Sequence, residues 1–161
     1  MKLTLRLAAI ADLIVPGSRL VDVGTDHALL PVWLLAEGVC PFVIATDVAP
    51  GPLEAARRSA GREGVSTGID FRLADGLDAV MAHEVDTVVI AGMGGETMQG
   101  IIARAPWLKS GPVRMILQPQ SKVPELLEFL SEEGYSVTAR HEVADAGKGY
   151  VIFAVEPWEL T

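Results

Sequence analysis

The sequence predicts an α/β fold, with a mostly parallel sheet and helices on both of its faces. Short apolar runs rich in β-branched residues alternate with segments of helical spacing along most of the 161 residues. One of these runs, residues 85–90, ends in three consecutive β-branched apolar residues, as strands covered on both faces do. Acidic or glycine-bearing turns follow four of the runs, which is typical of strands whose carboxyl ends share one edge of a sheet.

The composition indicates one globular domain over residues 1–161, long enough to bury a substantial core. No apolar run reaches the roughly 20 residues that a membrane-spanning helix needs, so we expect no membrane partner. A single cysteine, Cys40, excludes an internal disulfide and a cysteine metal cluster, so we expect no metal and a cytoplasmic location. The net charge of −8 is unfavourable for binding nucleic acid, although it does not forbid a local basic patch.

The chain begins with an amphipathic helix, because apolar residues recur at helical spacing from Leu3 to Ile14. A strand over residues 19–24 follows, and Gly24 allows a tight turn into a helix over residues 29–37. Thr25 or Asp26 is expected to cap that helix at its start.

The rest of the chain continues the alternation and then ends in a hairpin. Strands are predicted over residues 42–46, 69–73, 85–90 and 113–117, and helices over residues 53–62, 96–105 and 123–133. Two final strands, 135–143 and 150–155, are joined by a loop over 144–149. This hairpin is expected to give the sheet an antiparallel edge.

The carboxyl ends of the first four predicted strands carry acidic residues or glycines. They read Asp22-Gly24-Asp26, Asp47, Asp75-Gly76 and Gly92-Met93-Gly94-Gly95. Each has an ordinary explanation alone, because Asp is common in turns and at helix caps. In a parallel sheet, however, the four ends would converge on one crevice, where α/β proteins bind their ligands. We therefore expect a shared ligand site there.

The residues after the first strand argue against a phosphate-bearing ligand. A dinucleotide site needs Gly-x-Gly-x-x-Gly, but counting from Gly24 the second and third glycine positions hold Asp26 and Leu29. No Gly-Lys-Ser/Thr phosphate loop is present either. A carboxylate at Asp26 would repel a pyrophosphate, whereas the ammonium and sulfonium of S-adenosyl-L-methionine tolerate an acidic rim. The pattern therefore favours S-adenosyl-L-methionine.

Each strand end then has an expected role toward this cofactor. Asp47 would accept hydrogen bonds from the ribose hydroxyls, and Asp75 would accept one from the adenine amino group. Gly92 would let the fourth turn approach the sulfonium. Asp26 would anchor the ammonium or stabilise charge on the acceptor, the alternative being a helix cap.

Five strings of residues allow a comparison with known families. They are Asp22-Val23-Gly24-Thr25-Asp26-His27-Ala28-x-Leu30-Pro31, Gly51-Pro52-Leu53-x-Ala55, Asp75-Gly76-Leu77, Ile90-Ala91-Gly92-Met93-Gly94-Gly95 and Leu117-Gln118-Pro119. These strings resemble the bacterial tRNA (adenine-N1)-methyltransferase family known as TrmK. The resemblance implies a Rossmann-like class I methyltransferase fold with a seven-stranded sheet and an antiparallel C-terminal strand. It also implies S-adenosyl-L-methionine as methyl donor and N1 of a tRNA adenine as acceptor.

The chain departs from the family's pattern in two places, and both concern the RNA rather than the cofactor. Family members carry a further C-terminal helical region, which the 161 residues do not include, so we expect either an excised catalytic domain or a short relative with another acceptor. In both cases residues 1–161 are expected to form a single methyltransferase domain. The family's Gln-Pro-Asn is replaced by Gln118-Pro119-Gln120.

The candidate site residues fall into three groups. Those expected in catalysis are Asp26, Met93 and Gln118. Those expected to bind the cofactor are Asp22, Gly24, Thr25, Asp26, His27, Asp47, Val48, Asp75, Gly76, Leu77, Gly92 and Met93. Those expected to bind tRNA, with amides toward the base and cations toward phosphates, are Arg6, Gln118, Gln120, Lys148 and Tyr150.

Two other functions stay open at this point. A methyltransferase for a small molecule or a protein would suit the negative charge, and a non-catalytic module would bind the cofactor without transferring its methyl group. Enzymes that methylate amino groups usually carry Asn/Asp-Pro-Pro-aromatic after the fourth strand, where this chain has the open string 92–95. This difference favours a ring nitrogen as the target. The sequence leaves the oligomeric state open, a monomer included.

Overall fold

The computed structural model describes residues 2–25 and 28–158. Its strands are β1 (Arg19–Val23), β2 (Phe42–Asp47), β3 (Ile69–Leu73), β4 (Thr87–Met93), β5 (Arg114–Pro119), β6 (Tyr135–Asp145) and β7 (Lys148–Pro157). Its α-helices are α1 (Leu5–Asp12), α2 (Leu29–Ala36), α3 (Pro50–Arg62), α4 (Gly95–Ala103) and α5 (Val123–Glu132). Short 3-10 helices lie in the connections: η1 (Ser66–Gly68), η2 (Ala82–Glu84) and η3 (Pro106–Lys109).

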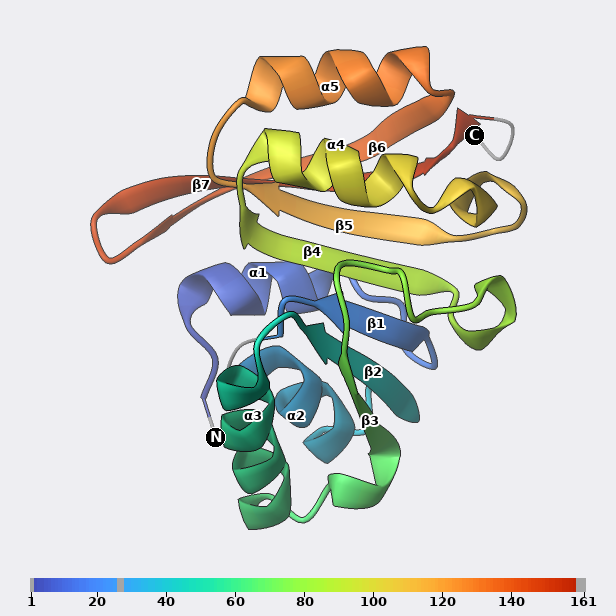
Figure 1. Ribbon diagram of the computed structural model, residues 1–161. Helices are drawn as coiled ribbons and strands as arrows, with labels where there is room; N and C mark the ends of the chain where they lie inside the picture. Colours follow the sequence, from blue (N-terminus) through green and yellow to red (C-terminus); the bar gives the residue numbers. More distant parts are fainter. Residues whose placement is uncertain (1, 26–27, 159–161) are drawn as a thin grey trace.

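The strands form a seven-stranded sheet in the order β3-β2-β1-β4-β5-β7-β6 (Figure 1). Strands β1 to β5 pair in parallel, and β7 pairs antiparallel with both β5 and β6. This arrangement confirms the predicted fold class and the antiparallel C-terminal strand that the resemblance implies. The antiparallel strand lies inside the sheet, so the edge is β6, which runs in the same direction as β5. The two strands at this edge pair antiparallel, which confirms the prediction that the hairpin gives the sheet an antiparallel edge.

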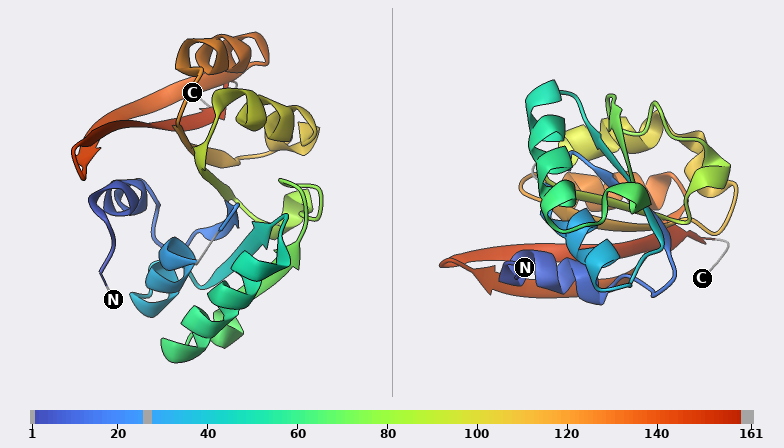
Figure 2. Two further views of the ribbon diagram at one scale, coloured as in Figure 1. Left: turned by 60° about the vertical axis from the view of Figure 1, so that its left-hand side comes forward. Right: turned by 90° about the horizontal axis from the view of Figure 1, so that it is seen from below.

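Both faces of the sheet are covered, as the apolar end of the fourth strand predicts. In β4, Val88 and Ile90 face the core beneath α4 and α5, whereas Val89 faces the core beneath α1 and α2. A smaller cluster joins β2 and β3 to α2 and α3. Figure 2 shows α4 and α5 on one side of the sheet and α1, α2 and α3 on the other. Burial on both faces makes these strands a rigid platform for whatever lies at their ends.

The hairpin of β6 and β7 extends beyond the edge of the sheet at which the parallel strands end (Figure 1, left). Its turn consists of Ala146 and Gly147, with φ angles of 53° and 78°. Two consecutive left-handed residues make the tight turn that suits twisted strands. Pairing therefore continues to Asp145 and Lys148, and the predicted loop over 144–149 is too long.

Candidate active site

The turn between β1 and α2 lies at the middle of the carboxyl edge of the sheet. Gly24 has a φ of 69°, and a Cβ at this position would overlap the Cε methyl of Met93. The next N–H, of Thr25, donates to the carbonyl of Thr46 in β2 at 2.9 Å. Glycine is therefore required here both by the backbone conformation and by the side chain above it.

Thr25 does not cap α2, so the Thr25 alternative of the predicted Thr25 or Asp26 cap is wrong. Its Oγ1 donates to Oδ2 of Asp22 at 2.9 Å, and α2 begins after Ala28 without a side-chain cap. The physical reason is that a buried carboxyl needs a donor more than a solvated helix end needs an acceptor. Asp26 and His27, which were predicted to bind the cofactor, lie outside the described residues.

Asp22 is a buried carboxyl beside this turn, with 7% of its surface exposed. Burial raises the pKa of Asp22 from its ordinary 3.8 to about 7, and the charge of Asp47 adds to this effect. The hydrogen bond from Thr25 and the positive charge of Arg6 act in the opposite direction. A cation placed against Asp22 would therefore stabilise its ionised form.

The ends of β2 and β3 are held together by hydrogen bonds. Oδ1 of Asp47 accepts the N–H of Ala49 at 3.1 Å, and the carbonyl of Asp47 accepts the N–H of Ala74 at 2.9 Å. The fully buried Thr46 donates from Oγ1 to the carbonyl of Gly76 at 3.3 Å. A buried threonine at the end of an apolar strand was a signal for this contact that the sequence reasoning did not use.

Three predicted cofactor residues lie near these strand ends in different surroundings. Val48 is 68% exposed at the rim. Asp75 forms an ion pair with Arg104 at 3.2 Å, so its proposed contact with an adenine has a competitor. Leu77 is buried in the core beneath α4, where it supports this loop from below.

β4 ends in a bulge that brings its backbone toward the site. Its pairing with β5 passes from Ala91–Gln118 to Met93–Pro119, so Gly92 has no partner residue in β5. The φ of Gly92 is 77°, which favours glycine. Further along, the N–H of Gly95 donates to the carbonyl of Ser121 at 2.9 Å, and a Cβ at Gly95 would lie 2.7 Å from that oxygen. In the string 92–95, Gly92 thus allows the bulge and Gly95 allows the close approach of the backbone at Ser121.

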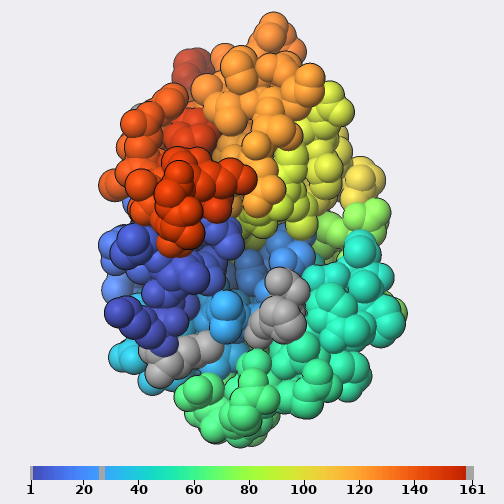
Figure 3. Space-filling view, turned by 90° about the vertical axis from the view of Figure 1, so that its left-hand side faces the viewer, coloured from blue at the N-terminus to red at the C-terminus, as the bar shows by residue number. Residues whose placement is uncertain are grey.

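Two cavities meet at these turns. The first, about 300 Å³, lies between α1 and the β1–α2 turn, and the second, about 390 Å³, lies between the ends of β2, β3 and β4. Gly24, Ala91 and Gly92 line both cavities. Figure 3 faces this side of the molecule, where α1, the hairpin and α3 surround the strand ends. Of the predicted residues, Arg6, Asp22, Thr25 and Gln120 line the first cavity, and Asp47, Val48, Asp75, Gly76 and Met93 line the second.

Arg6 forms the α1 side of the first cavity, next to the β6–β7 hairpin. Its guanidinium lies 5.6 Å from the ring centre of Tyr150, and the ammonium of Lys148 lies 5.4 Å from the same ring. The N–H of Arg6 donates to Oδ2 of Asp145 at 3.1 Å, which joins the start of α1 to the hairpin. Three residues predicted to bind tRNA thus come together from the two ends of the chain.

The two predicted glutamines differ in exposure. Gln120 is exposed and lines the first cavity. Gln118 is fully buried, and its Oε1 accepts hydrogen bonds from Nη1 of Arg6 at 2.9 Å and from the N–H of Gly92 at 3.1 Å. Gln118 therefore lies behind the cavity and presents no surface to a base.

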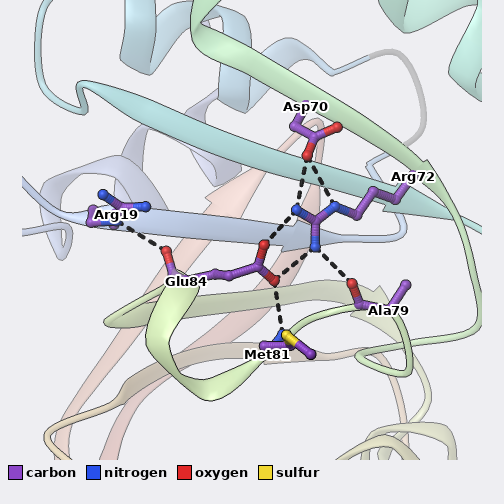
Figure 4. Close-up of polar contacts among 6 residues, drawn as sticks. All are labelled: Arg19, Asp70, Arg72, Ala79, Met81 and Glu84. Atoms are coloured by element: carbon purple, nitrogen blue, oxygen red, sulfur yellow. Dashed lines mark hydrogen bonds and ion pairs between the residues drawn. The ribbon is translucent and has the colours of Figure 1, made fainter.

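A network around Arg72 fixes the connection from β3 to β4 (Figure 4). The guanidinium pairs with Glu84 at 2.7 Å and with Asp70 at 2.8 Å, and it donates to the carbonyl of Ala79 at 2.6 Å. The hydrogen bonds from Arg72 are the main reason that the pKa of Glu84 falls from 4.5 to about 2. The sequence reasoning missed this network, although a charged Asp-x-Arg pair inside a strand was a visible signal. The network anchors the segment that carries the rim of the second cavity.

No helix in the described part of the chain is long and apolar enough to cross a membrane. Within residues 2–25 and 28–158, no three or more His, Cys, Asp or Glu side chains are grouped so that they could hold a metal ion. Among the described residues, the charged groups that line the two cavities are the carboxyls of Asp22, Asp47 and Asp75 and the guanidinium of Arg6.

Comparison with known proteins identifies similar chains. Residues 3–153 match the family described as "Methyltransferase domain". The chain is 31% identical over 156 residues to the tRNA (adenine(22)-N(1))-methyltransferase of Bacillus subtilis, an alignment that covers 97% of this chain and 66% of the relative. The chain thus spans about two thirds of that relative's length.

Solved structures agree with this result. The crystal structure of the B. subtilis m1A22 tRNA methyltransferase TrmK has a TM-score of 0.91 at 31% identity, covering 97% of this chain and 67% of that one. The structure of Streptococcus pneumoniae Sp1610 in complex with S-adenosyl-L-methionine has a TM-score of 0.92 at 34% identity, covering 97% of this chain and 73% of that one. The similarity extends over nearly all of this chain.

Proposed function

Because the chain belongs to the methyltransferase domain family and, within it, to the TrmK group, we propose that it transfers the methyl group of S-adenosyl-L-methionine to N1 of an adenine in tRNA. The observation that carries this proposal is the pair of cavities that share Gly24, Ala91 and Gly92. One cavity would hold the donor nucleoside, and the other opens toward a cationic surface suited to RNA.

The residues of the two cavities fit S-adenosyl-L-methionine. Asp22, in the first cavity, is a partner for the ammonium group, and Asp47, in the second, is an acceptor for the ribose hydroxyls. The strip of Gly24 and Gly92 between them lacks side chains, so it leaves room for the sulfonium centre. No phosphate-binding loop is needed for this ligand, and the sequence carries none.

Methyl transfer to adenine N1 depends mainly on how the protein positions the donor and the acceptor. S-adenosyl-L-methionine supplies a methyl group activated by its sulfonium. Adenine N1 has a free lone pair at neutral pH, so no side chain needs to remove a proton first. The protein holds the two partners in line, and Met93, packed over Gly24, forms the wall beside the reacting centre.

Acidic side chains suit the charge that develops in the acceptor. The adenine ring becomes positive when N1 is methylated, and a partly desolvated carboxylate stabilises such a charge. Asp22, whose pKa is about 7, lines the first cavity, but we assign it to the donor's ammonium group. Asp26 remains the residue that we propose to act directly on the ring or on the donor's ammonium.

The mouth of the first cavity is the proposed tRNA contact. Since the chain carries a net charge of −8, phosphate contacts must come from local cations. Arg6, which lines this cavity, and Lys148 both lie within 5.6 Å of the ring centre of Tyr150, and Gln120 offers an amide to a base edge.

The test is transfer of labelled methyl groups to unmodified tRNA, followed by digestion and identification of the nucleoside. We expect the label in 1-methyladenosine. Label found only on a protein or a small molecule would show that the acceptor is not tRNA. Donor binding without transfer to any acceptor would show that the chain is a non-catalytic binding module.

A further inference from the structure

We propose that Gln118 is a positioning residue that couples the donor and acceptor sides of the site through one oxygen atom. Oε1 of Gln118 accepts hydrogen bonds from the N–H of Gly92 and from the guanidinium of Arg6. Gly92 lines both cavities, and Arg6 lines the first. The inference rests on the proposed function for the meaning of the two sides, whereas the hydrogen bonds themselves do not depend on it.

The first half of the coupling arises from the bulge in β4. A bulge leaves one residue outside the regular ladder, and here that residue is Gly92, opposite the step from Gln118 to Pro119 in β5. Its N–H would lack an acceptor if the neighbouring strand offered only backbone. The side chain of Gln118 supplies that acceptor at 3.1 Å. Gln118 thereby sets the position of Gly92, which separates the two cavities.

The second half holds Arg6 in place. Nη1 of Arg6 donates to the same oxygen at 2.9 Å, while the guanidinium lies over the ring of Tyr150. Nε2 of Gln118 donates to the carbonyl of Pro119 at 3.2 Å, which turns the amide so that its oxygen faces both donors. The long side chain of Arg6 is thus held in place by Gln118 and by the ring of Tyr150.

A buried acceptor that serves two donors links their positions. Gln118 has no exposed surface, so water cannot replace its oxygen if either donor moves. If Arg6 moves toward an RNA phosphate, it must therefore either break its hydrogen bond to Gln118 or shift Gln118, and Gly92 would then shift with it. This link accounts for a glutamine in a strand whose neighbours are buried and apolar.

The experiment compares Gln118→Met, which keeps the length and removes the acceptor, with Gln118→Glu, which keeps an acceptor oxygen. Gln99→Met on α4 is the matched control, because this glutamine lines neither cavity. Each protein is assayed for donor affinity by calorimetry, for KM and kcat with tRNA, and for hydrogen exchange at the Gly92 amide by NMR. Arg6→Met and the double variant with Gln118→Met complete a double-mutant cycle.

We expect Gln118→Met to raise KM for tRNA about tenfold and the donor dissociation constant about threefold, and to speed exchange at Gly92 at least about tenfold. Gln118→Glu should recover most of these losses. In the Arg6→Met background, Gln118→Met should add no further increase in KM, because its effect on RNA passes through Arg6. A merely structural role would instead lower kcat and thermal stability without this dependence on Arg6.

Two results would overturn the inference: a Gln118→Met protein with unchanged exchange at Gly92, or effects on KM that add fully to those of Arg6→Met. If the wild-type protein methylates no tRNA, the proposed function fails. In that case exchange at Gly92 and RNA binding measured by fluorescence anisotropy, in the same cycle of variants, still decide the inference. Persistence of the coupling there would support it, and its absence would overturn it.

Discussion

Replacing Asp22 by Asn removes the charge of the buried carboxyl and nearly preserves its shape. The amide oxygen of Asn can still accept the hydrogen bond from Oγ1 of Thr25, which the carboxyl accepts at 2.9 Å. The substitution therefore isolates the consequences of ionisation. Two consequences follow, one for folding and one for binding the donor.

The folding consequence has a definite sign. The folded protein holds the Asp22 proton more tightly than the unfolded chain, because its pKa is about 7 rather than 3.8. The free energy of unfolding therefore falls as pH rises from about 4 to 7, and is level on either side of this window. At 1.36 kcal/mol for each factor of ten, this difference in pKa corresponds to about 4 kcal/mol. The Asn variant does not lose this stability.

For donor binding, in contrast, the ionised form of Asp22 is favourable. An ammonium group favours the ionised form of Asp22, so donor binding below pH 7 must release a proton. Affinity for S-adenosyl-L-methionine should then fall about tenfold for each pH unit below 7 in the wild-type protein. The Asn variant should bind more weakly at pH 8, with little change in affinity between pH 5.5 and 8. Asp22 would thus sacrifice stability of the free protein for binding of a cation.

The assay is urea unfolding of both proteins from pH 4 to pH 8, with calorimetric titration of the donor at pH 5.5 and 8. Asp12→Asn, on the exposed side of α1, serves as the matched control. The quantity that matters is the difference between variant and wild type, because other groups titrate in the same range. A difference in unfolding free energy that stays constant from pH 4 to 8 would show that the folded protein does not raise the pKa of Asp22.

Three further substitutions test other parts of the site. Asp47→Ala should weaken donor binding by about 1.5–3 kcal/mol, measured by calorimetry, because hydrogen bonds to a charged acceptor are lost. An unchanged affinity would show that the ribose does not bind at Asp47. Glu84→Gln should lower the unfolding free energy at pH 7 by about 1–2 kcal/mol. The pKa of Glu84 is lowered to about 2 by Arg72, so this deficit should shrink as pH falls from 4.5 to 2, and a pH-independent deficit would contradict it. Gly24→Ala should cost about 2–4 kcal/mol in urea unfolding and abolish donor binding, whereas Gly17→Ala, with a φ of 88° and open space around it, should cost only about 1 kcal/mol; equal costs would rule out the overlap with Met93.

The sequence carried most of the fold because its local signals agree. β3 has the predicted bounds, and the apolar run in β4 is buried on both faces as expected. The start of α3 was missed because Pro50, which looks like a turn residue, suits the first helical position. Strand order is a different matter, since nothing within the hairpin itself places β7 between β5 and β6.

The parts of the site that lie at strand ends could be predicted from the sequence, whereas the contacts that depend on tertiary packing could not. The convergence of Gly24, Asp47 and Gly92 follows from strands that end at one edge. The position of Gln118 behind the cavity follows from a bulge in the neighbouring strand, which shifts the register by one residue. The pairing of Asp75 with Arg104 likewise depends on how α4 packs, and no local pattern encodes it.

The strand ends form a site that suits a positively charged nucleoside without phosphates. This can be measured by calorimetric titration of the wild-type protein with S-adenosyl-L-methionine, in parallel with a nicotinamide dinucleotide. We expect one molecule of S-adenosyl-L-methionine to bind per chain and the dinucleotide to give no heat. Saturable binding of the dinucleotide alone would contradict this expectation.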